Sequence, residues 1–355
     1  MGGGPTNEKI LCLLPGPEPI EIIERIRARY PKAEVTYVSR AFGTNNSDLS
    51  PDLFKDKTIL FTTAVLPSEP SAAPHLKYVH LFSAGVDRIL KHPLFLESNI
   101  PFSNCSGVHG PQISEWVIMT LLIHGHKYLP MYDAQKERKW SRNFSNGTRD
   151  LVGQRIGILG YGAIGRQVAH ITKAMGMEVL AYTATPKDTP ESRADHGYFV
   201  PGIGDPDGSI PSEWFSGLDK PSLHKFLSQN LDVLIVSVPL TPDTHHFLSS
   251  AEFDILGKNP PLISNIARGP IIDQPALIKA LEDGRVGSAA LDVTDPEPLP
   301  ADDPLWVAPN TIITPHISGA STAYIERAFQ VFERNLENIE KGQPLINIIS
   351  RKKGY

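Results

Sequence analysis

A glycine-rich turn between two apolar strands constrains the fold of this chain more than any other stretch. The apolar run 156–159 ends at Gly160, which begins the pattern Gly160-x-Gly162-x-x-Gly165. Apolar residues at helical spacing follow, and then a second apolar run at 177–182. The order strand, glycine turn, helix and strand is typical of the first half of a dinucleotide-binding unit.

Each glycine of this pattern has a separate expected role. Gly160 permits a tight turn, Gly162 lets a pyrophosphate approach the backbone, and Gly165 lets the helix pack closely on the strand. The free N–H groups at the start of the helix, around Ala163 and Ile164, would then face the phosphates. We therefore expect these five residues to bind the cofactor, and an ordinary strand-to-helix turn is the alternative.

The second strand does not end in the acidic residue that NAD sites commonly place there. Such a residue accepts hydrogen bonds from the ribose 2′-hydroxyl, and its charge repels the 2′-phosphate of NADP. Here Thr183 takes the position, and Thr185 and Lys187 follow. Two hydroxyls and an ammonium group can bind a phosphate. The sequence therefore predicts NADP as the preferred cofactor, with NAD still able to bind.

The size and charge of the chain limit the classes of function. Its 355 residues have room for about two domains, and a net charge of -5 gives no reason to expect nucleic acid or an anionic membrane as a partner. Cys12 and Cys105 lack the spacing of metal ligands or of a disulfide framework, so we expect no metal site and a cytoplasmic protein. Met1-Gly2 and Thr6 fit a loose myristoylation pattern, although a glycine-rich start without a lipid is favoured.

Strands and helices alternate along the chain, which predicts parallel sheets with helices on their faces. The first unit has no glycine fingerprint and is predicted to be a smaller α/β domain with four strand-like runs, at residues 9–14, 35–38, 58–61 and 78–82. The last of these runs leads into Ser83-Ala84-Gly85. Its backbone N–H groups could bind an anion, and a plain turn is equally consistent with the local sequence.

A long detour separates the strand at 177–182 from the next clear strand at 231–237. Within it, residues 201–208 are built of Pro, Gly and Asp with one apolar residue. Such a stretch can bury little surface, so we expect it to be more mobile than the sheet. The whole detour, residues 187–222, is interpreted as a lid or a surface decoration.

Arg268, Glu297 and His316 each come shortly after a strand-like run. Because ligands bind outside the carboxyl ends of strands in an open parallel sheet, the three side chains would lie at one edge. Taken singly, each residue is better explained as a structural ion pair or a loop charge. Together they suit one reaction: a guanidinium binds a 2-oxo acid, a histidine protonates its carbonyl oxygen as hydride arrives, and a carboxylate fixes the histidine tautomer.

The ordered set of motifs resembles the D-isomer-specific 2-hydroxyacid dehydrogenases, a family that includes glyoxylate and hydroxypyruvate reductases. The motifs are Gly160-x-Gly162-x-x-Gly165, Pro239-Leu240-Thr241-Pro242, Asn265-x-x-Arg268-Gly269, Asp292-x-x-x-x-Glu297-Pro298 and Pro315-His316. The resemblance implies that Arg268 binds the substrate, that His316 contacts it as the acid/base, and that Glu297 pairs with His316. It also implies that Ala84 and Gly85 hold the substrate carboxylate through backbone N–H groups. Further cofactor contacts are implied at Val238, Pro239, Thr244, Ile266, Ala267, Asp292 and His316.

The resemblance further implies two Rossmann-like or flavodoxin-like parallel-sheet domains with a cofactor cleft between them. Residues 121–310 would form the dinucleotide-binding domain, and residues 1–120 with 311–355 the substrate-binding domain. The expected protein is a homodimer that reduces a small 2-oxo acid to the D-2-hydroxy acid. The alternatives are a relative acting on a larger or phosphorylated acid or on formate, or a dinucleotide-sensing, corepressor-like binding protein.

Overall fold

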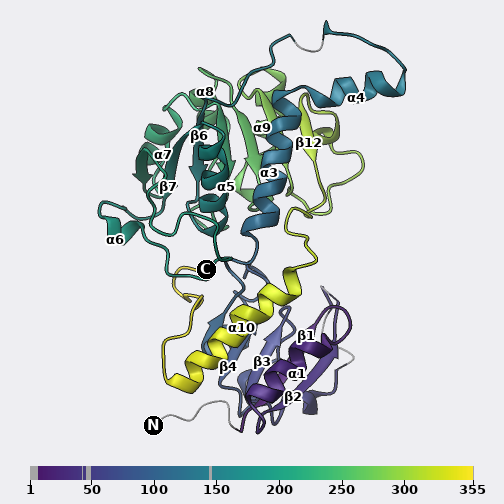
Figure 1. Ribbon diagram of the computed structural model, residues 1–355, viewed down its shortest axis with the longest axis vertical. Helices are drawn as coiled ribbons and strands as arrows, with labels where there is room; N and C mark the ends of the chain where they lie inside the picture. The colour runs from purple at the N-terminus through teal and green to yellow at the C-terminus, as the bar shows by residue number, and fades with distance from the viewer. Residues whose placement is uncertain (1–6, 42, 45–48, 144–145, 355) are drawn as a thin grey trace. The chain divides into compact units, whose positions relative to one another are not determined.

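The chain forms two compact units, each built around one parallel sheet (Figure 1). The computed structural model describes residues 7–41, 43–44, 49–143 and 146–354. Unit 1 comprises Met1–Val108 and Thr322–Tyr355, and unit 2 comprises His109–Ser321. The segment with the loose myristoylation pattern, residues 1–6, lies outside the described residues.

Unit 1 contains a five-stranded parallel sheet in the order β2-β1-β3-β4-β5. Its strands are β1 (Lys9–Leu14), β2 (Glu34–Ser39), β3 (Ile59–Thr62), β4 (Tyr78–Leu81) and β5 (Phe102–Ser103). Its helices are α1 (Ile20–Arg29), α2 (Pro93–Glu97) and α10 (Tyr324–Lys341), with short 3₁₀ turns at η1 (Pro51–Phe54) and η2 (Pro70–Ala72). Although α10 follows unit 2 in the sequence, it belongs to unit 1, where it packs beside α1. Its Phe329 and Phe332 are buried against Phe61 of β3.

Unit 2 contains a seven-stranded parallel sheet in the order β12-β11-β10-β9-β6-β7-β8. Its strands are β6 (Arg155–Leu159), β7 (Glu178–Thr183), β8 (Glu213–Ser216), β9 (Val233–Val236), β10 (Leu262–Asn265), β11 (Ser288–Leu291) and β12 (Thr311–Ile313). Its helices are α3 (Gly110–Gly125), α4 (Tyr128–Lys136), α5 (Ala163–Ala174), α6 (Pro190–Arg193), α7 (Lys220–Leu227), α8 (Ser250–Leu256) and α9 (Gln274–Glu282), with 3₁₀ turns at η4 (Gly269–Ile271) and η5 (Pro304–Val307). The two sheets confirm the predicted fold class.

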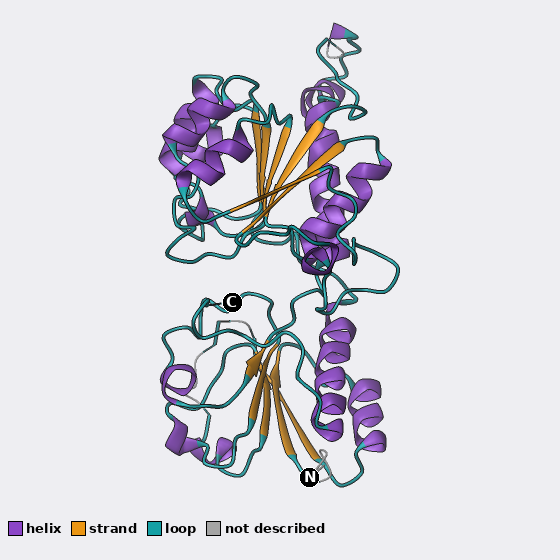
Figure 2. Ribbon diagram, turned by 90° about the vertical axis from the view of Figure 1, so that its left-hand side faces the viewer, coloured by secondary structure: helices purple, strands orange, loops and turns teal. Residues whose placement is uncertain are grey.

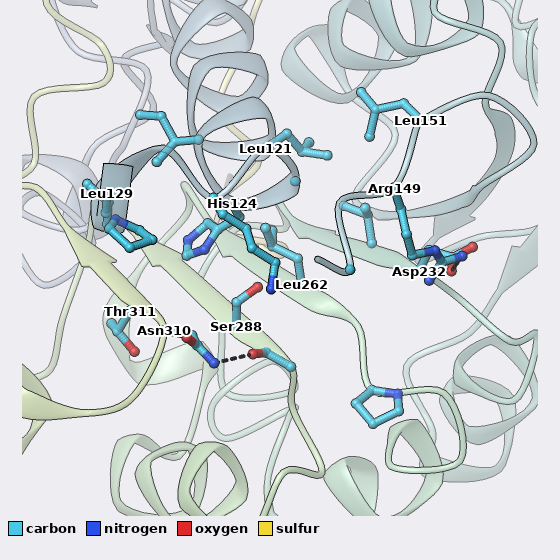
Figure 3. Close-up of a pocket in the computed structure, with 18 of the residues that line it drawn as sticks. Leu121, His124, Leu129, Arg149, Leu151, Asp232, Leu262, Ser288, Asn310 and Thr311 are labelled. Carbon is cyan, nitrogen blue, oxygen red and sulfur yellow. Dashed lines mark hydrogen bonds and ion pairs between the residues drawn. The ribbon is translucent and has the colours of Figure 1, made fainter. Parts of the chain in front are cut away.

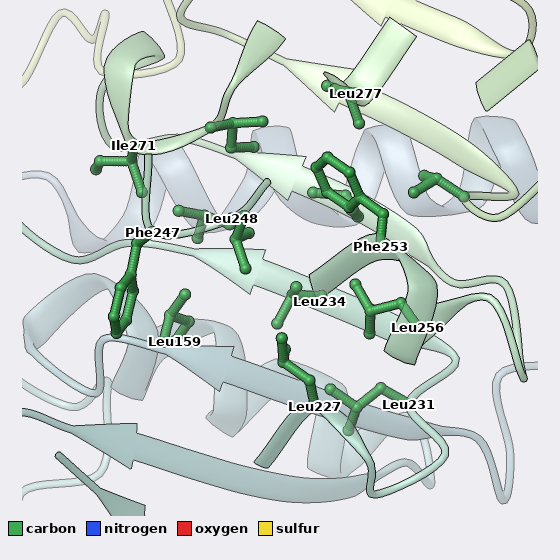
Figure 4. Packing of buried hydrophobic residues seen from close by; sticks show 14 of the residues in the cluster. Leu159, Leu227, Leu231, Leu234, Phe247, Leu248, Phe253, Leu256, Ile271 and Leu277 are labelled. Atoms are coloured by element: carbon green, nitrogen blue, oxygen red, sulfur yellow. The ribbon is translucent and has the colours of Figure 1, made fainter. Parts of the chain in front are cut away.

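Buried apolar side chains fill both faces of the seven-stranded sheet, which Figure 2 shows edge-on between two layers of helices. On one face α3 and α5 contribute Trp116 and Val168. On the other, α7, α8 and α9 contribute residues such as Phe253 and Leu277, which belong to one buried cluster with Leu234 of the strand β9 (Figure 4). Because helices cover both faces of β9, all four of its residues, Val-Leu-Ile-Val, are apolar and buried.

The division between the units differs from the expected boundaries at 120/121 and 310/311. The position 120/121 lies inside α3, and the compact units divide after Val108 because α3 packs along α5 of unit 2. At the other end, β12 pairs with β11, so that the return to unit 1 comes after Ser321. Among the described residues no helix is long and apolar enough to cross a membrane.

Within residues 201–208 of the detour, an insertion after β7, only Asp205 and Gly208 are buried, as expected of a stretch with one apolar residue, but side-chain contacts anchor the segment to unit 2. Its greater mobility stays a prediction. Asp205 is only 4% exposed, and its carboxylate accepts hydrogen bonds from the Tyr161 hydroxyl at 2.7 Å and from the backbone N–H of Ser209 at 3.0 Å. The Gln167 side chain accepts from the Gly204 N–H at 2.6 Å. Beyond this point the chain forms β8, which extends the sheet beside β7.

Candidate active site

The strand order of unit 2 places the candidate residues along one edge of the sheet. The chain leaves β6 towards β7 on one side and returns to β9 on the other, so the change of direction lies between β6 and β9. Open parallel sheets bind ligands outside the carboxyl strand ends at such a point. The glycine turn follows β6. The loops that carry Arg268, Glu297 and His316 follow the three strands β10, β11 and β12, which are neighbours.

The three glycines of the turn have different surroundings, and these match the roles expected of them. Gly160 has φ +107°, and a side chain there would meet the backbone of Ser237 at 2.6 Å. A side chain at Gly165 would meet the carbonyl oxygen of Gly160 at 2.4 Å. A side chain at Gly162 would meet nothing within 4 Å. The space beside Gly162 therefore leaves room for a ligand to approach the backbone.

The amino end of α5 can accept an anion. Gly162 caps this helix without a side-chain hydrogen bond, and the first turn has no acidic residue. The uncapped N–H groups, including those of Ala163 and Ile164, and the helix dipole favour a phosphate at this end. The residues present thus fit a dinucleotide pyrophosphate.

The end of β7 carries no carboxylate. The Thr183 hydroxyl donates to the carbonyl oxygen of Thr185 at 2.8 Å, which closes a tight loop. The carbonyl oxygen of Lys187 accepts from Arg193 Nε at 2.8 Å, and the Arg193 guanidinium lies over the Trp214 ring of β8, 5.8 Å from its centroid. The Arg193 side chain is thereby held between the Lys187 backbone and the Trp214 ring.

The other expected cofactor residues follow β9 and β10. Val238 and Pro239 lie directly beyond β9, and Ile266 and Ala267 directly beyond β10. Thr244 is 3% exposed, and its hydroxyl donates to the Pro239 carbonyl oxygen at 2.7 Å. In this structure, therefore, the Thr244 hydroxyl closes the loop after β9.

The loop that carries Arg268 is fixed by its neighbours on both sides. Asn265 Nδ2 donates to the Arg268 carbonyl oxygen at 3.0 Å, and the Asn265 side-chain oxygen accepts from the Ala267 N–H at 3.1 Å. A side chain at Gly269 would meet the Thr294 carbonyl oxygen at 1.9 Å, so only glycine fits there. This close approach brings the Arg268 loop against the loop after β11 that bears Glu297.

His316 and Glu297 form a hydrogen-bonded pair. His316 Nδ1 lies 2.9 Å from Glu297 Oε2, and the Thr294 N–H donates to the other Glu297 oxygen at 3.2 Å. A histidine whose Nδ1 faces a carboxylate carries its proton there when neutral, which leaves Nε2 to exchange a proton with a ligand. Both side chains are partly exposed, so a small molecule can reach them.

Asp292 anchors the segment that carries His316. Asp292 is 2% exposed, and one carboxylate oxygen accepts from the Thr314 hydroxyl at 2.6 Å and from the Ile317 N–H at 2.9 Å. The other oxygen accepts from the N–H and the hydroxyl of Ser318. Asp292 is thus a support for His316 in this structure. Sequence reasoning missed Thr314 and Ser318, because hydroxyl residues in a loop carry no periodic signal.

Ala84 and Gly85 follow β4 in unit 1, again at the carboxyl end of a parallel strand. Both residues are partly exposed. Asn104 Nδ2 donates to the carbonyl oxygen of Ala84 at 2.8 Å. The loop is therefore an ordered part of unit 1.

Comparison with known proteins agrees with this geometry. The family model of the "D-isomer specific 2-hydroxyacid dehydrogenase, NAD binding domain" matches residues 118–201 and 208–318, with its gap inside the insertion. The chain is 30% identical over 294 residues to a glyoxylate reductase of Thermofilum pendens, which covers 81% of this chain and 79% of the relative. It is likewise 30% identical over 294 residues to a glyoxylate/hydroxypyruvate reductase A of Salmonella newport, which covers 81% of this chain and 85% of that protein.

A solved structure shares the fold. The crystal structure of a D-isomer specific 2-hydroxyacid dehydrogenase family protein from Aeromonas salmonicida has a TM-score of 0.74 and 30% sequence identity. The alignment covers 97% of this chain and 99% of the other. The two-sheet architecture is therefore common to both proteins.

Proposed function

Because the chain belongs to the D-isomer-specific 2-hydroxyacid dehydrogenases, we propose that it reduces small 2-oxo acids of the glyoxylate and hydroxypyruvate type to D-2-hydroxy acids. The observation that supports this most directly is the pair of His316 and Glu297, 2.9 Å apart, beside the loop of Arg268. The substrate class is supported by the similarity to the glyoxylate reductase and the glyoxylate/hydroxypyruvate reductase A, and by the chemistry of these three side chains.

The roles of the three residues follow from their chemistry. The Arg268 guanidinium binds the 2-oxo acid and polarises the carbonyl oxygen. The nicotinamide dinucleotide, when bound, supplies a hydride to the carbonyl carbon. His316 Nε2 gives a proton to the carbonyl oxygen, and Glu297 holds the imidazole by its Nδ1. In the oxidation of a hydroxy acid, His316 takes that proton back.

Unit 2 is proposed as the dinucleotide-binding domain and unit 1 as the substrate-binding domain. The open space at Gly162 and the uncapped start of α5 support a pyrophosphate site, and Ala84 and Gly85 would bind the substrate carboxylate. The expected cofactor is NADPH, since no carboxylate ends β7 to repel a 2′-phosphate, with NADH as the weaker partner. Lys187 and Arg193 add positive charge near this strand end.

A homodimer is proposed on the basis of one exposed apolar surface. Helix α4 and the segment after it expose Tyr128, Leu129 and Met131, and Trp140 is 94% exposed. A hollow of about 620 Å³ lies beside the first turn of α4, at the amino ends of β10, β11 and β12 (Figure 3). This edge of the sheet is opposite the candidate active site. Exposed aromatic side chains beside a hollow are typical of interfaces between protein chains.

A cytoplasmic location is also proposed, because the two cysteines are free and buried.

The test of this function is an assay of NADPH and NADH oxidation with a panel of 2-oxo acids, followed by chiral analysis of the product. We expect turnover of glyoxylate and hydroxypyruvate, D-glycerate from the latter, and kcat/KM at least tenfold higher with NADPH, about 1.4 kcal/mol of discrimination. Tight binding of NADPH without turnover of any acid would instead support a dinucleotide sensor. Equal kinetics with NADH would contradict the cofactor preference alone.

A further inference from the structure

The loop after β4 has an unusual pattern of hydrogen bonds. The carbonyl oxygens of four successive residues, 82–85, each accept one hydrogen bond. The donors, in the order of the carbonyls, are the Tyr324 hydroxyl at 2.8 Å, the Cys105 N–H at 3.1 Å, Asn104 Nδ2 at 2.8 Å and the Ser83 hydroxyl at 2.7 Å. All four donors belong to unit 1. The orientation of every peptide plane between residues 82 and 86 is therefore fixed from the carbonyl side.

Fixing a carbonyl also fixes the N–H group of the same peptide. In a planar trans peptide the N–H points opposite to the C=O. The carbonyls of Ser83, Ala84 and Gly85 therefore determine where the N–H groups of Ala84, Gly85 and Val86 point. Within the described ranges, no hydrogen bond is donated by these three N–H groups. Backbone donors without a protein acceptor, next to one another, form a cradle for an anion.

The amide of Asn104 is held in one orientation. Its side-chain oxygen accepts from the Ser106 N–H at 3.1 Å, which directs Nδ2 towards Ala84. The Asn104 backbone is held in turn by Asn347, whose carbonyl oxygen accepts from the Asn104 N–H at 3.2 Å and whose side chain donates to the Asn104 carbonyl oxygen at 3.2 Å. Asn104 is 7% exposed, so water competes little for these contacts.

We propose that Asn104 and Ser83 are positioning residues for the carboxylate of the 2-oxo acid. Through the carbonyls of Ala84 and Gly85, they orient the N–H groups of Gly85 and Val86, which join that of Ala84 in binding the carboxylate. This inference rests on the proposed function and deepens it. It assigns part of the substrate affinity to two side chains that do not touch the substrate.

The role differs from a merely structural one in the kinetic constant that it changes. If the loop loses its preset orientation, the carboxylate must order the N–H groups when it binds, so KM for the 2-oxo acid rises. Cofactor binding, which depends on unit 2, is unaffected. General damage to unit 1 would instead lower the melting temperature and the fraction of active enzyme, and KM would stay unchanged.

The variants are Asn104→Asp and Ser83→Ala in the full-length enzyme. Asn104→Asp keeps the shape and the acceptor for Ser106 but replaces the donor to Ala84 with an oxygen; Ser83→Ala removes the donor to Gly85. The matched control is Asn338→Asp, a change at a 4% exposed asparagine of the same unit whose Nδ2 donates to the Pro344 carbonyl oxygen at 3.0 Å. For each protein, kcat and KM are measured for glyoxylate and for NADPH, together with the melting temperature.

We expect KM for glyoxylate to rise about tenfold in Asn104→Asp and about threefold in Ser83→Ala, with KM for NADPH within about twofold of the wild-type value. The control should keep both KM values. An unchanged glyoxylate KM in folded variants, or an equal rise in the control, overturns the inference. If Asn104→Asp does not fold, Ser83→Ala decides by the same criterion. A wild-type enzyme that turns over no 2-oxo acid would instead refute the proposed function.

Discussion

Asp292 fixes the backbone on which His316 stands. The carbonyl oxygen of Asp292 accepts from the His316 N–H at 2.8 Å, while its carboxylate accepts from residues on both sides of the histidine. His316 has φ +55°, a conformation that residues other than glycine adopt rarely and only when the surroundings enforce it. The buried carboxylate supplies that constraint.

Asp292→Asn should therefore lower kcat by displacing His316. The asparagine amide places an N–H₂ group where one carboxylate oxygen now accepts from Ser318, so at least one buried contact becomes donor against donor. We expect a fall of about tenfold or more in kcat and a lower melting temperature. Asp254→Asn, at the surface, is the control. A variant with wild-type kcat would show that the carboxylate does not support the histidine.

Glu297→Gln should lower kcat much more than it changes KM. Glu297 holds His316 Nδ1 at 2.9 Å, and the amide of glutamine keeps the shape but loses the charge that supports an imidazolium. Removal of the carboxylate partner of a catalytic histidine costs up to about 10⁴ in other enzymes. Because this pair is partly exposed, we expect on the order of 10² here. Steady-state kinetics of Glu297→Gln and of the exposed control Glu282→Gln measure this fall in kcat. A near-normal kcat in Glu297→Gln would show that Glu297 takes no part in the mechanism.

Tyr161→Phe should loosen the insertion. The Tyr161 hydroxyl donates to Asp205 at 2.7 Å, so its loss leaves a buried carboxylate with one partner fewer. The expected loss of stability is about 1–3 kcal/mol. Limited proteolysis should cut the variant between residues 201 and 212 faster than it cuts the wild-type protein. Equal cleavage of the variant, the wild type and the exposed control Tyr128→Phe would show that Asp205 does not anchor the loop.

The stability of the protein should fall in mild acid because of His80. This histidine is fully buried beside Ser103 and Tyr78, and burial lowers its pKa to about 3 from an ordinary value of 6.5. Between these two pH values the unfolded chain binds a proton at His80 that the folded chain does not. The contribution of neutral His80 to the free energy of unfolding is therefore fully present above pH 6.5 and is lost as the pH falls towards 3.

Urea unfolding across this pH range measures the effect. The slope for the wild type should exceed that of His80→Gln by up to about 1.4 kcal/mol per pH unit. The control His75→Gln, at an exposed position, should keep the wild-type slope. Identical slopes in all three proteins would show that His80 is not held neutral by the fold.

The sequence predicted the elements with strong local signals. The glycine turn after β6 and the apolar runs of β1, β6 and β9 follow from periodicity and from single glycines. Strand β8 was not predicted, because Glu-Trp-Phe-Ser has no continuous apolar run, and its place in the sheet is set by its pairing with β7. In the candidate site, Arg268, Glu297 and His316 could be selected from their residue types and from their positions shortly after strands.

The supports of the site could not be predicted in the same way. Asp205 and Asp292 each meet partners far away in the sequence, at Tyr161 and at Ser318, and no local pattern records such contacts. The hydrogen bond of the Thr244 hydroxyl within its own loop was likewise not predicted, and its part in cofactor binding stays a prediction. Side-chain hydrogen bonds that depend on the tertiary fold are visible only in three dimensions.

The substitution of Arg268 tests the central claim most directly. Glyoxylate reduction by the wild type, Arg268→Ala and Arg268→Lys is compared in kcat/KM with NADPH, and NADPH binding confirms that each variant is folded. Loss of the guanidinium that binds the 2-oxo acid should lower kcat/KM by on the order of 10³ in Arg268→Ala, and lysine should restore only part, because an ammonium cannot reproduce the planar fork. Near-normal kcat/KM in the alanine variant would remove Arg268 from the mechanism and contradict the account.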